Sequence, residues 1–120
     1  MTRTVLFVCP HGAGKSRIAA AFFDHVAPEG WRAISAGQDP ADQVSAHALM
    51  LLRGTECEEF LDRGAPRALT DVPSPSRIVA IDCEVEGAER WDLEERVIGG
   101  GMRDEIRRRA QALAREVSNG

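Results

Sequence analysis

Short apolar runs alternate along the chain with segments in which apolar residues recur at helical spacing. Residues 4–8 and residues 78–81 are almost continuously apolar and rich in β-branched side chains, which is typical of strands buried on both faces. Residues 31–35 predict another short strand, closed by Ala36 and Gly37. A mostly parallel sheet is the arrangement that such strands favour.

Helical spacing predicts three main helices between these strands. The first covers residues 16–27, the second lies between Pro40 and Gly54, and the last covers residues 102–117. A short helix is expected around residues 58–61. The alternation of strands and helices predicts an α/β protein, with residues 1–120 forming a single domain.

The fourth strand is expected around residues 91–93, with residues 97–98 as the alternative. The three glycines at positions 99–101 predict a flexible hinge before the last helix. In parallel α/β sheets, ligands bind at the carboxyl ends of strands. Cys9 and Cys83 each follow a predicted strand directly, so both would lie at that edge.

Composition and charge exclude several classes of protein. The 120 residues are 43% hydrophobic and 28% charged, with a net charge of −4, and the basic run at residues 107–109 lies close to acidic residues. A nucleic-acid-binding face is therefore not expected, nor is a membrane-spanning segment. No signal peptide is expected at the start of the sequence, and the number of cysteines, three, is odd. Both features predict a cytoplasmic protein with free thiols.

The segment VLFVCPHGAGKSR, residues 5–17, places a glycine-rich loop between a strand and a helix. The N–H groups of such a loop, together with the positive end of the helix dipole, form a cradle for an anion. The residues expected to bind phosphate are Pro10, His11, Gly12, Ala13, Gly14, Lys15, Ser16 and Arg17.

Two interpretations of this loop remain open. Gly14-Lys15-Ser16 matches the end of the nucleotide-binding pattern G-x-x-x-x-G-K-[ST], and Asp82 could then serve as the magnesium-side carboxylate. However, Cys9 stands where that pattern requires its first glycine. A nucleotide site would leave the cysteine without a role.

The alternative interpretation centres the loop on Cys9. A cysteine facing the N–H cradle is stabilised as a thiolate, which is a nucleophile for phosphorus or arsenic. Ser16 is spaced to hydrogen-bond the sulfur, and Lys15, the only lysine in the chain, would neutralise the oxyanion. His11 would line the pocket entrance or tune the thiolate. A plain buried thiol is the simplest alternative for Cys9.

The loop and the helix after it resemble those of the low-molecular-weight protein tyrosine phosphatases and the related thiol-coupled arsenate reductases. Ile34-Ser35-Ala36-Gly37, the run at residues 66–70 before the third strand and the start of the last helix at residues 102–106 extend the resemblance. It covers most of the chain and is poorest at residues 54–63. The resemblance implies a three-layer α/β sandwich with a four-stranded parallel sheet.

This resemblance implies hydrolysis of a phosphomonoester, such as phosphotyrosine, through a thiophosphate intermediate on Cys9. The first alternative is arsenate reduction by Cys9 and Cys83 with an external thiol. The second is an oxyanion-binding module without turnover, and the third is the nucleotide-binding protein described above. Expected partners are phosphate, sulfate or arsenate, with a phosphoprotein or a thiol reductant. No cofactor is expected.

The chain departs from the family pattern at two catalytic positions. Lys15 replaces the loop arginine, which grips two oxygens through a planar fork, and lysine offers only a point charge. Arg17 should point away from Lys15 on the helix and should not compensate. The family's Asp-Pro general acid is missing, and Glu95 falls at that position, with a solvated acidic loop as the alternative.

The cysteines and histidines complete the set of candidate residues. Cys83 occupies the position of the first resolving cysteine of the reductases or, alternatively, only caps a core strand, while a second resolving cysteine has no counterpart. Cys57 is interpreted as a buried or incidental thiol. His11, His25 and His47 show no metal-ligand spacing, so no metal site is expected.

Overall fold

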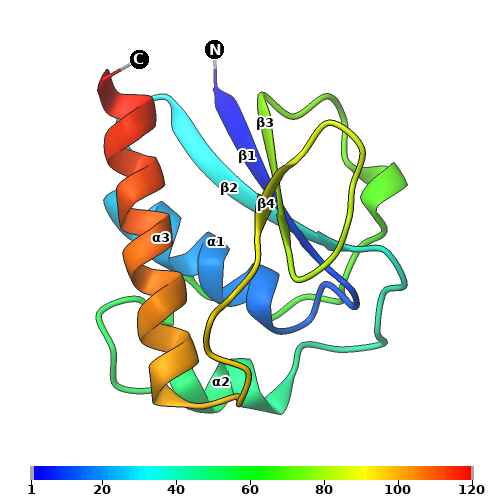
Figure 1. The fold of residues 1–120 in the computed structure, drawn as a ribbon, viewed down its shortest axis with the longest axis vertical. Helices are drawn as coiled ribbons and strands as arrows, with labels where there is room; N and C mark the ends of the chain where they lie inside the picture. The colour runs from blue at the N-terminus through cyan, green and yellow to red at the C-terminus, as the bar shows by residue number, and fades with distance from the viewer. Residues whose placement is uncertain (1, 120) are drawn as a thin grey trace.

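The computed structural model describes residues 2–119 and contains a four-stranded parallel sheet (Figure 1). Its strands are β1 (Arg3–Cys9), β2 (Trp31–Gly37), β3 (Arg77–Ile81) and β4 (Glu89–Trp91), in the order β2-β1-β3-β4. Every neighbouring pair is parallel. The α/β class and the parallel sheet predicted from the sequence are confirmed.

Burial on both faces explains the continuous apolar run of β1. Val5, Phe7 and Cys9 belong to the larger core cluster, which the sheet forms with three helices. Leu6 and Val8 face the opposite side, where a smaller cluster includes Ala36. Alternate side chains of a strand point to opposite faces, so a central strand covered on both sides must be apolar at every position.

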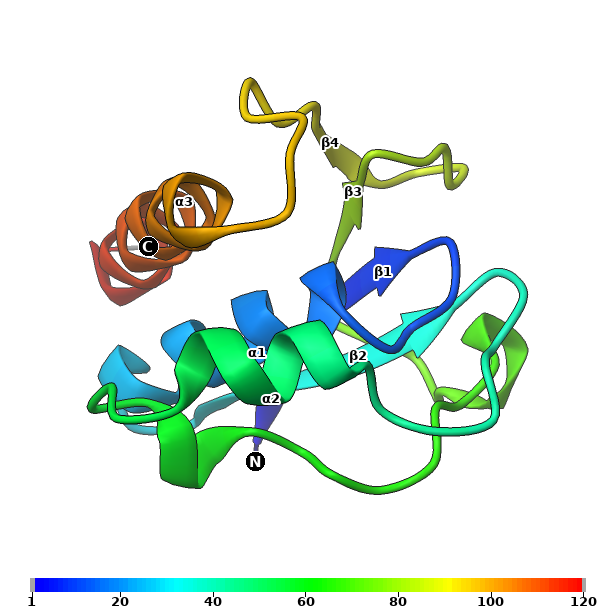
Figure 2. The same cartoon turned by 90° about the horizontal axis from the view of Figure 1, so that it is seen from below.

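Two long helices cover one face of the sheet. They are α1 (Lys15–Val26) and α3 (Gly100–Asn119), which pack against each other (Figure 2). The short helix α2 (Ala46–Leu52) contacts α1. The other face is covered by a loop with the 3₁₀ helix η2 (Leu69–Asp71), so this third layer is thin. A second 3₁₀ helix, η1 (Glu58–Phe60), follows α2.

Several predicted element bounds are corrected by the structure. The fourth strand ends at Trp91 instead of beginning there, because its pairing with β3 runs from Glu89 to Trp91. The alternative at residues 97–98 is wrong: Val97 is 78% exposed and pairs with no strand. The second helix is shorter than predicted, because Ser45 caps it by accepting the N–H of His47.

The predicted glycine hinge is partly wrong as well. Gly100 and Gly101 form the first turn of α3, and the N–H of Arg103 donates to the carbonyl of Gly99 at 3.0 Å. The carboxyl carbon of Glu95 would lie 3.2 Å from a Cβ at position 101. Glycine therefore allows this acidic side chain to pack closely against the start of the helix.

The strand order creates a crevice at one edge of the sheet. From β1, the chain passes through α1 to β2 on one side and later returns to β3 on the other side. In such sheets, the switch in direction opens a site outside the carboxyl ends of the two central strands. The residues at these ends are Cys9, Asp82 and Cys83. Among residues 2–119, no helix combines the length and apolar character needed to cross a bilayer.

We expect Gly37→Ala to disturb this edge of the sheet. A Cβ at position 37 would lie 2.5 Å from the carbonyl carbon of His11 and 2.6 Å from the nitrogen of Gly12, which are backbone atoms and cannot rotate away. The variant should lower the free energy of unfolding in urea by about 1–3 kcal/mol. Gly99→Ala is the control, because nothing lies within 4 Å of a Cβ there. Equal stabilities for the two variants would refute this interpretation.

Candidate active site

The loop between β1 and α1, residues 10–14 (the Cys9 loop), is anchored through its carbonyl groups. Every carbonyl oxygen from residue 9 to residue 14 accepts a hydrogen bond, at 2.8–3.3 Å. Four of the donors are backbone N–H groups in the segment after β2; the other two are the side chain of Arg17 and the N–H of Ile18. The six donors, in the order of their acceptors, are Gln38, Asp39, Ala41, Arg17, Ser45 and Ile18.

The N–H groups of the same segment are left without protein partners. Those of residues 11–16 donate to no acceptor within the described residues 2–119, and α1 begins at Lys15 without a capping side chain. Buried or half-buried N–H groups need an acceptor, and a helix N-terminus favours a negative one. The loop therefore has the donors and the dipole of an oxyanion cradle.

Two glycines bring the Cys9 loop onto the end of β2. Gly12 has a φ of 64°, and a Cβ there would lie 2.6 Å from the nitrogen of Gly37. A Cβ on Gly37 would meet the backbone of the loop at a similar distance. This contact gives a physical reason for the Ser-Ala-Gly ending of β2, because only glycine allows the two backbones to approach so closely.

Cys9 lies at the base of the loop, beside Ser16. The Sγ of Cys9 donates to the Oγ of Ser16 at 3.1 Å, and both residues are buried. A hydroxyl can rotate to donate instead of accept, so Ser16 is able to donate to the sulfur when Cys9 ionises. The pairing expected from the sequence between these two side chains is thus present in the structure.

Lys15 does not point freely into the cradle. Its Nζ donates to Oδ2 of Asp82 at 2.6 Å, and the lysine side chain is 24% exposed while that of Asp82 is 7% exposed. Lys15 begins α1 and Asp82 follows β3, so the ion pair joins the two segments that border the crevice. An oxyanion above Cys9 has to share Lys15 with this carboxylate.

Asp82 binds three partners at once. Besides Lys15, its Oδ1 accepts the N–H of Leu93 and the Nη1 of Arg96, both at 3.0 Å. Burial by itself would raise the pKa of Asp82, but the hydrogen bonds from Lys15, Leu93 and Arg96 outweigh it and hold the pKa below its ordinary value. Asp82 also has a φ of 54°, a conformation that aspartate tolerates better than most residues. The group is an anchor that stays ionised, unsuited to donate a proton.

Arg17 is buried beneath the Cys9 loop. Its Nε donates to the carbonyl of Gly12 at 3.0 Å, and its Nη1 binds the carbonyl of Asp62. Within the described residues, its Nη2 is the one buried side-chain nitrogen or oxygen without a hydrogen-bond partner. Burial lowers the pKa of this guanidinium, and the charges of Asp62 and Cys9 act in the opposite direction. Arg17 thus contacts the loop from the carbonyl side, where it orients the backbone.

His11 and Cys83 are the two other candidate residues near Cys9. Nδ1 of His11 is 3.0 Å from the carbonyl oxygen of Asp39, so its exposed ring is held by the segment after β2. The Sγ of Cys83 donates weakly to the carbonyl of Val8, at 3.6 Å. Burial raises the pKa of Cys83, and the nearby charge of Cys9 raises it further. Cys83 therefore lies at the same edge of the sheet as the end of β1.

Glu95, the candidate general acid, is directed elsewhere. Its carboxylate packs against Gly101, and its backbone N–H donates to Oε1 of Glu105 at 2.9 Å. The buried Glu105 also accepts the N–H of Glu94 and the Nε of Arg109, both at 3.0 Å. No hydrogen bond among residues 2–119 joins Glu95 to Cys9, Lys15 or Ser16.

Sequence reasoning missed the part that Asp82 plays in fixing Lys15. Its signal was its position directly after a buried strand, at the edge where Cys9 also lies, although only the nucleotide interpretation assigned it a role. Arg96 carried no signal, because its contact with Asp82 depends on the path of the loop after β4.

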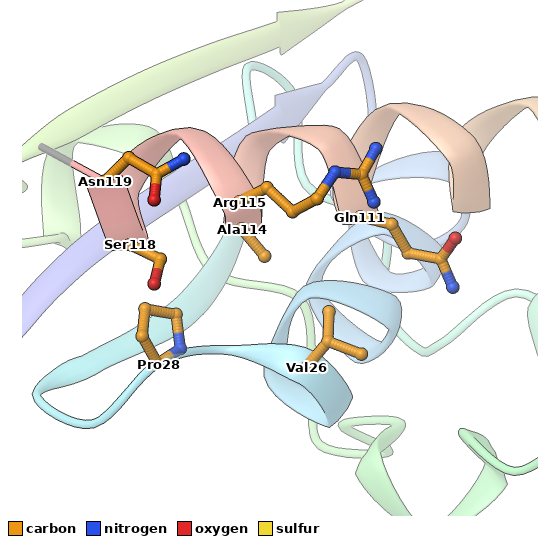
Figure 3. Close-up of a pocket in the computed structure, with 7 residues that line it drawn as sticks. All are labelled: Val26, Pro28, Gln111, Ala114, Arg115, Ser118 and Asn119. Carbon is orange, nitrogen blue, oxygen red and sulfur yellow. The ribbon is translucent and has the colours of Figure 1, made fainter.

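A separate hollow lies near the C-terminal ends of α1 and α3. Val26 and Pro28 line one side and Gln111 and Arg115 line the other (Figure 3). None of its lining residues belongs to the Cys9 loop, and it contains no cysteine, histidine or carboxylate. The Cys9 loop lies at the other end of α1.

Solved structures with two different activities are similar to this chain. No protein-family model matches the chain. An arsenate reductase from Archaeoglobus fulgidus is 28% identical over 92% of this chain and 98% of its own, with a TM-score of 0.71. A thioredoxin-dependent arsenate reductase from Corynebacterium glutamicum is 26% identical over 98% of this chain and 62% of its own, with a TM-score of 0.77. The YwlE arginine phosphatase from Geobacillus stearothermophilus is 20% identical over 98% of this chain and 94% of its own, with a TM-score of 0.74.

The chain has the fold of the arsenate reductases and low-molecular-weight protein tyrosine phosphatases, and the resemblance seen in its sequence is confirmed. Both activities occur on this fold, so the fold supports the superfamily and leaves the reaction to be argued from the site.

We expect Asp82→Asn to bind inorganic phosphate more tightly. The change removes a negative charge beside Lys15, while an asparagine oxygen can still accept the N–H of Leu93. A gain of about tenfold corresponds to roughly 1.4 kcal/mol, a fraction of the energy between close unit charges. Protection of Cys9 from alkylation by phosphate measures this affinity. Asp92→Asn is the control, since Asp92 is exposed and its side chain pairs only with Arg90 in the described part of the chain. Equal phosphate affinities in the two variants would contradict the expectation.

Acid should weaken the fold partly through Glu105. Burial would raise its pKa, but the N–H groups of Glu95 and Glu94 and the side chain of Arg109 outweigh this and lower it. The stabilisation is therefore complete above the ordinary glutamate pKa of about 4.3 and is lost as the pH falls through the lower pKa of the folded state.

Glu105→Gln should accordingly unfold in urea with a free energy about 1–3 kcal/mol lower at pH 7, and the difference from the unmodified chain should shrink toward pH 3. Glu94→Gln is the control, because Glu94 is exposed. A difference that does not change with pH would argue against the role given to the ionised Glu105.

Proposed function

We propose that the chain is a thiol-dependent arsenate reductase in which Cys9 is the nucleophile. The observation that carries this proposal is the arrangement of the Cys9 loop: its carbonyls are all engaged by other segments, and the N–H groups of residues 11–16 have no partner among residues 2–119. A tetrahedral oxyanion can accept these N–H groups while its central atom faces the sulfur of Cys9.

In the first step, the Cys9 thiolate attacks the arsenic of arsenate. An As–S bond forms, an As–O bond breaks, and the oxygen leaves as water after protonation. The N–H groups of the loop hold the remaining oxygens. Before the sulfur of Cys9 reacts, the hydroxyl of Ser16 donates a hydrogen bond to it. Lys15 provides positive charge to the oxyanion, shared with Asp82.

In the second step, a thiolate attacks Sγ of Cys9. The As–S bond breaks, its electron pair goes to arsenic, and arsenite leaves while a disulfide forms. Two thiols are oxidised and As(V) is reduced to As(III), so the electrons balance. Cys83 is the proposed attacking thiol, because it follows β3 at the same edge and its Sγ contacts the carbonyl next to Cys9. An external thiol protein must then reduce the disulfide.

Three observations favour reduction over ester hydrolysis. Ester hydrolysis requires a proton donor for the leaving group, and the carboxylate of Glu95 packs against Gly101 instead. Asp82 is held ionised by its cationic partners. Two solved structures, 28% and 26% identical to this chain, are arsenate reductases, and one of them is thioredoxin-dependent. A dithiol protein of that kind is the reductant that we propose, in a reducing compartment such as the cytoplasm.

Hydrolysis of a phosphomonoester is the second candidate, because the cradle suits phosphate as well as arsenate. Aryl phosphates with good leaving groups need little help from an acid, so residual activity toward them is compatible with the site. A nucleotide site is less well supported. The hydroxyl that would ligate magnesium belongs to Ser16, which is fully buried and hydrogen-bonded to Cys9.

The test compares the unmodified chain with Cys9→Ser and Cys83→Ser. The unmodified chain, supplied with thioredoxin, thioredoxin reductase and NADPH, should form arsenite from arsenate. Cys9→Ser should lose this activity entirely, because no As–S bond can form. Cys83→Ser should retain alkylation of Cys9 and its protection by phosphate, but lose at least about 90% of turnover, in line with the loss of an essential group.

Mass spectrometry after arsenate treatment without reductant should find a disulfide between Cys9 and Cys83. Hydrolysis of an aryl phosphate without arsenite formation would favour the phosphatase instead. Phosphate protection of Cys9 with neither activity would identify an oxyanion-binding module. Failure of phosphate to protect Cys9 would overturn the assignment of the cradle itself.

A further inference from the structure

Three potential metal ligands meet at the end of α1 that lies away from the Cys9 loop. His25 stands in the last turn of α1, and Glu56 and Cys57 stand in the segment between α2 and η1. One ligand atom from each, a ring nitrogen, a carboxylate oxygen and a sulfur, all lie within 4.8 Å of one another. At about 1.5 Å per residue, the helix separates His25 from the start of α1 by roughly 15 Å.

Tertiary packing brings these residues together. The helix α1 packs against η1, and the rings of His25 and Phe60 are in edge contact with centroids 5.5 Å apart. Figure 2 shows the segment after α2 passing beneath the end of α1. This segment is fixed by its own bonds: the N–H of Cys57 donates to Oγ1 of Thr55 at 3.3 Å, and Thr55 in turn binds the carbonyl of Leu52.

The three residues differ in burial in a way that suits a metal. Cys57 is fully buried, and its thiol forms no disulfide. His25 and Glu56 are exposed. In a tetrahedral zinc site, the ligand atoms are about 3.3–3.7 Å apart, as follows from bond lengths of about 2.0–2.3 Å. A bound ion would therefore require the exposed side chains of His25 and Glu56 to move closer to Cys57.

We propose that His25, Glu56 and Cys57 form a binding site for a divalent ion of the zinc class, with a fourth position open to water. The mixture of nitrogen, oxygen and sulfur ligands suits zinc or cobalt, whereas magnesium and calcium bind oxygen ligands. The site ties α1 to the segment before η1 and involves none of the residues proposed for the reaction. The proposal of this metal site is therefore independent of the proposed oxyanion chemistry.

Arg107 competes with a metal ion for one of these ligands. Its guanidinium is paired with the carboxylate of Glu56 and also lies over the ring of Phe22, 5.5 Å from the ring centroid. A bound cation would displace Arg107 from Glu56 but leave the contact with Phe22. Removing this positive charge should therefore strengthen metal binding, an effect that would not be expected for metal bound elsewhere on the surface.

The test uses Co²⁺ as a spectroscopic probe in a Cys9→Ser/Cys83→Ser background, where Cys57 is the only thiol. Addition of Co²⁺ should produce a thiolate-to-cobalt absorption band in the near ultraviolet, and Zn²⁺ should abolish it. His25→Ala should weaken Co²⁺ binding at least tenfold. His47→Ala is the matched control, because His47 is also exposed on a helix and is not part of the site. It should leave the band and the affinity unchanged.

Arg107→Met gives an independent test that keeps an apolar cover over Phe22. We expect this variant to bind Co²⁺ several-fold more tightly. Zn²⁺ should also raise the melting temperature of the unmodified chain more than that of His25→Ala. A missing thiolate band, or equal Co²⁺ affinity in His25→Ala and His47→Ala, would overturn the proposal, as would unchanged or weaker binding in a folded Arg107→Met.

Discussion

The candidate site depends on one constraint: the carbonyl groups at the end of β1 and through the Cys9 loop are all engaged by other parts of the chain. Most of their donors lie in the segment directly after β2, so the loop conformation is imposed from outside. A peptide group with its carbonyl held on one side presents its N–H on the other. The anion cradle is thus a by-product of how this backbone is anchored, and the side chains of the loop contribute little to it. This explains why proline, alanine and glycine suffice at most of its positions.

The cation of the site is subject to a second constraint. A lysine has one charged group and no fork, so it cannot hold a carboxylate and grip an oxyanion in the planar, two-point manner open to arginine. Lys15 already holds Asp82, which in turn holds the loop after β4 through Leu93 and Arg96. The same ion pair therefore joins α1, β3 and the loop that leads to α3. The ion pair that makes this edge of the sheet rigid therefore weakens the attraction of Lys15 for an anion.

The parts of the fold that could be predicted from sequence were those set by local pattern. The apolar runs of β1 and β3 and the helical spacing of α1 and α3 specify their own structure, because burial on both faces or along one stripe leaves few alternatives. The glycine loop beside Cys9 could also be predicted, because the spacing of Cys9, the glycines, Lys15 and Ser16 is a local pattern. The three-residue strand β4 was misplaced, because its position is set by pairing with β3 and not by its own residues. The direction of Glu95 and the partner of Lys15 depend on distant backbone, and no local pattern encodes either. The same holds for His25 and Cys57, which are separated by 32 positions in the chain and share no motif.

The close contact of Gly12 with Gly37 has a consequence for the order in which the chain acquires its properties. The cradle consists of residues near the N-terminus, but the groups that shape it arrive only when β2 has paired with β1 and the following segment has turned back. A nascent or partly unfolded chain therefore contains every residue of the loop and none of its affinity for anions. Because the proposed oxyanion would bind only the completed arrangement, we expect phosphate in the surroundings to shift the folding equilibrium toward the native state. A ligand of this site would therefore also raise the free energy of unfolding of the whole sheet.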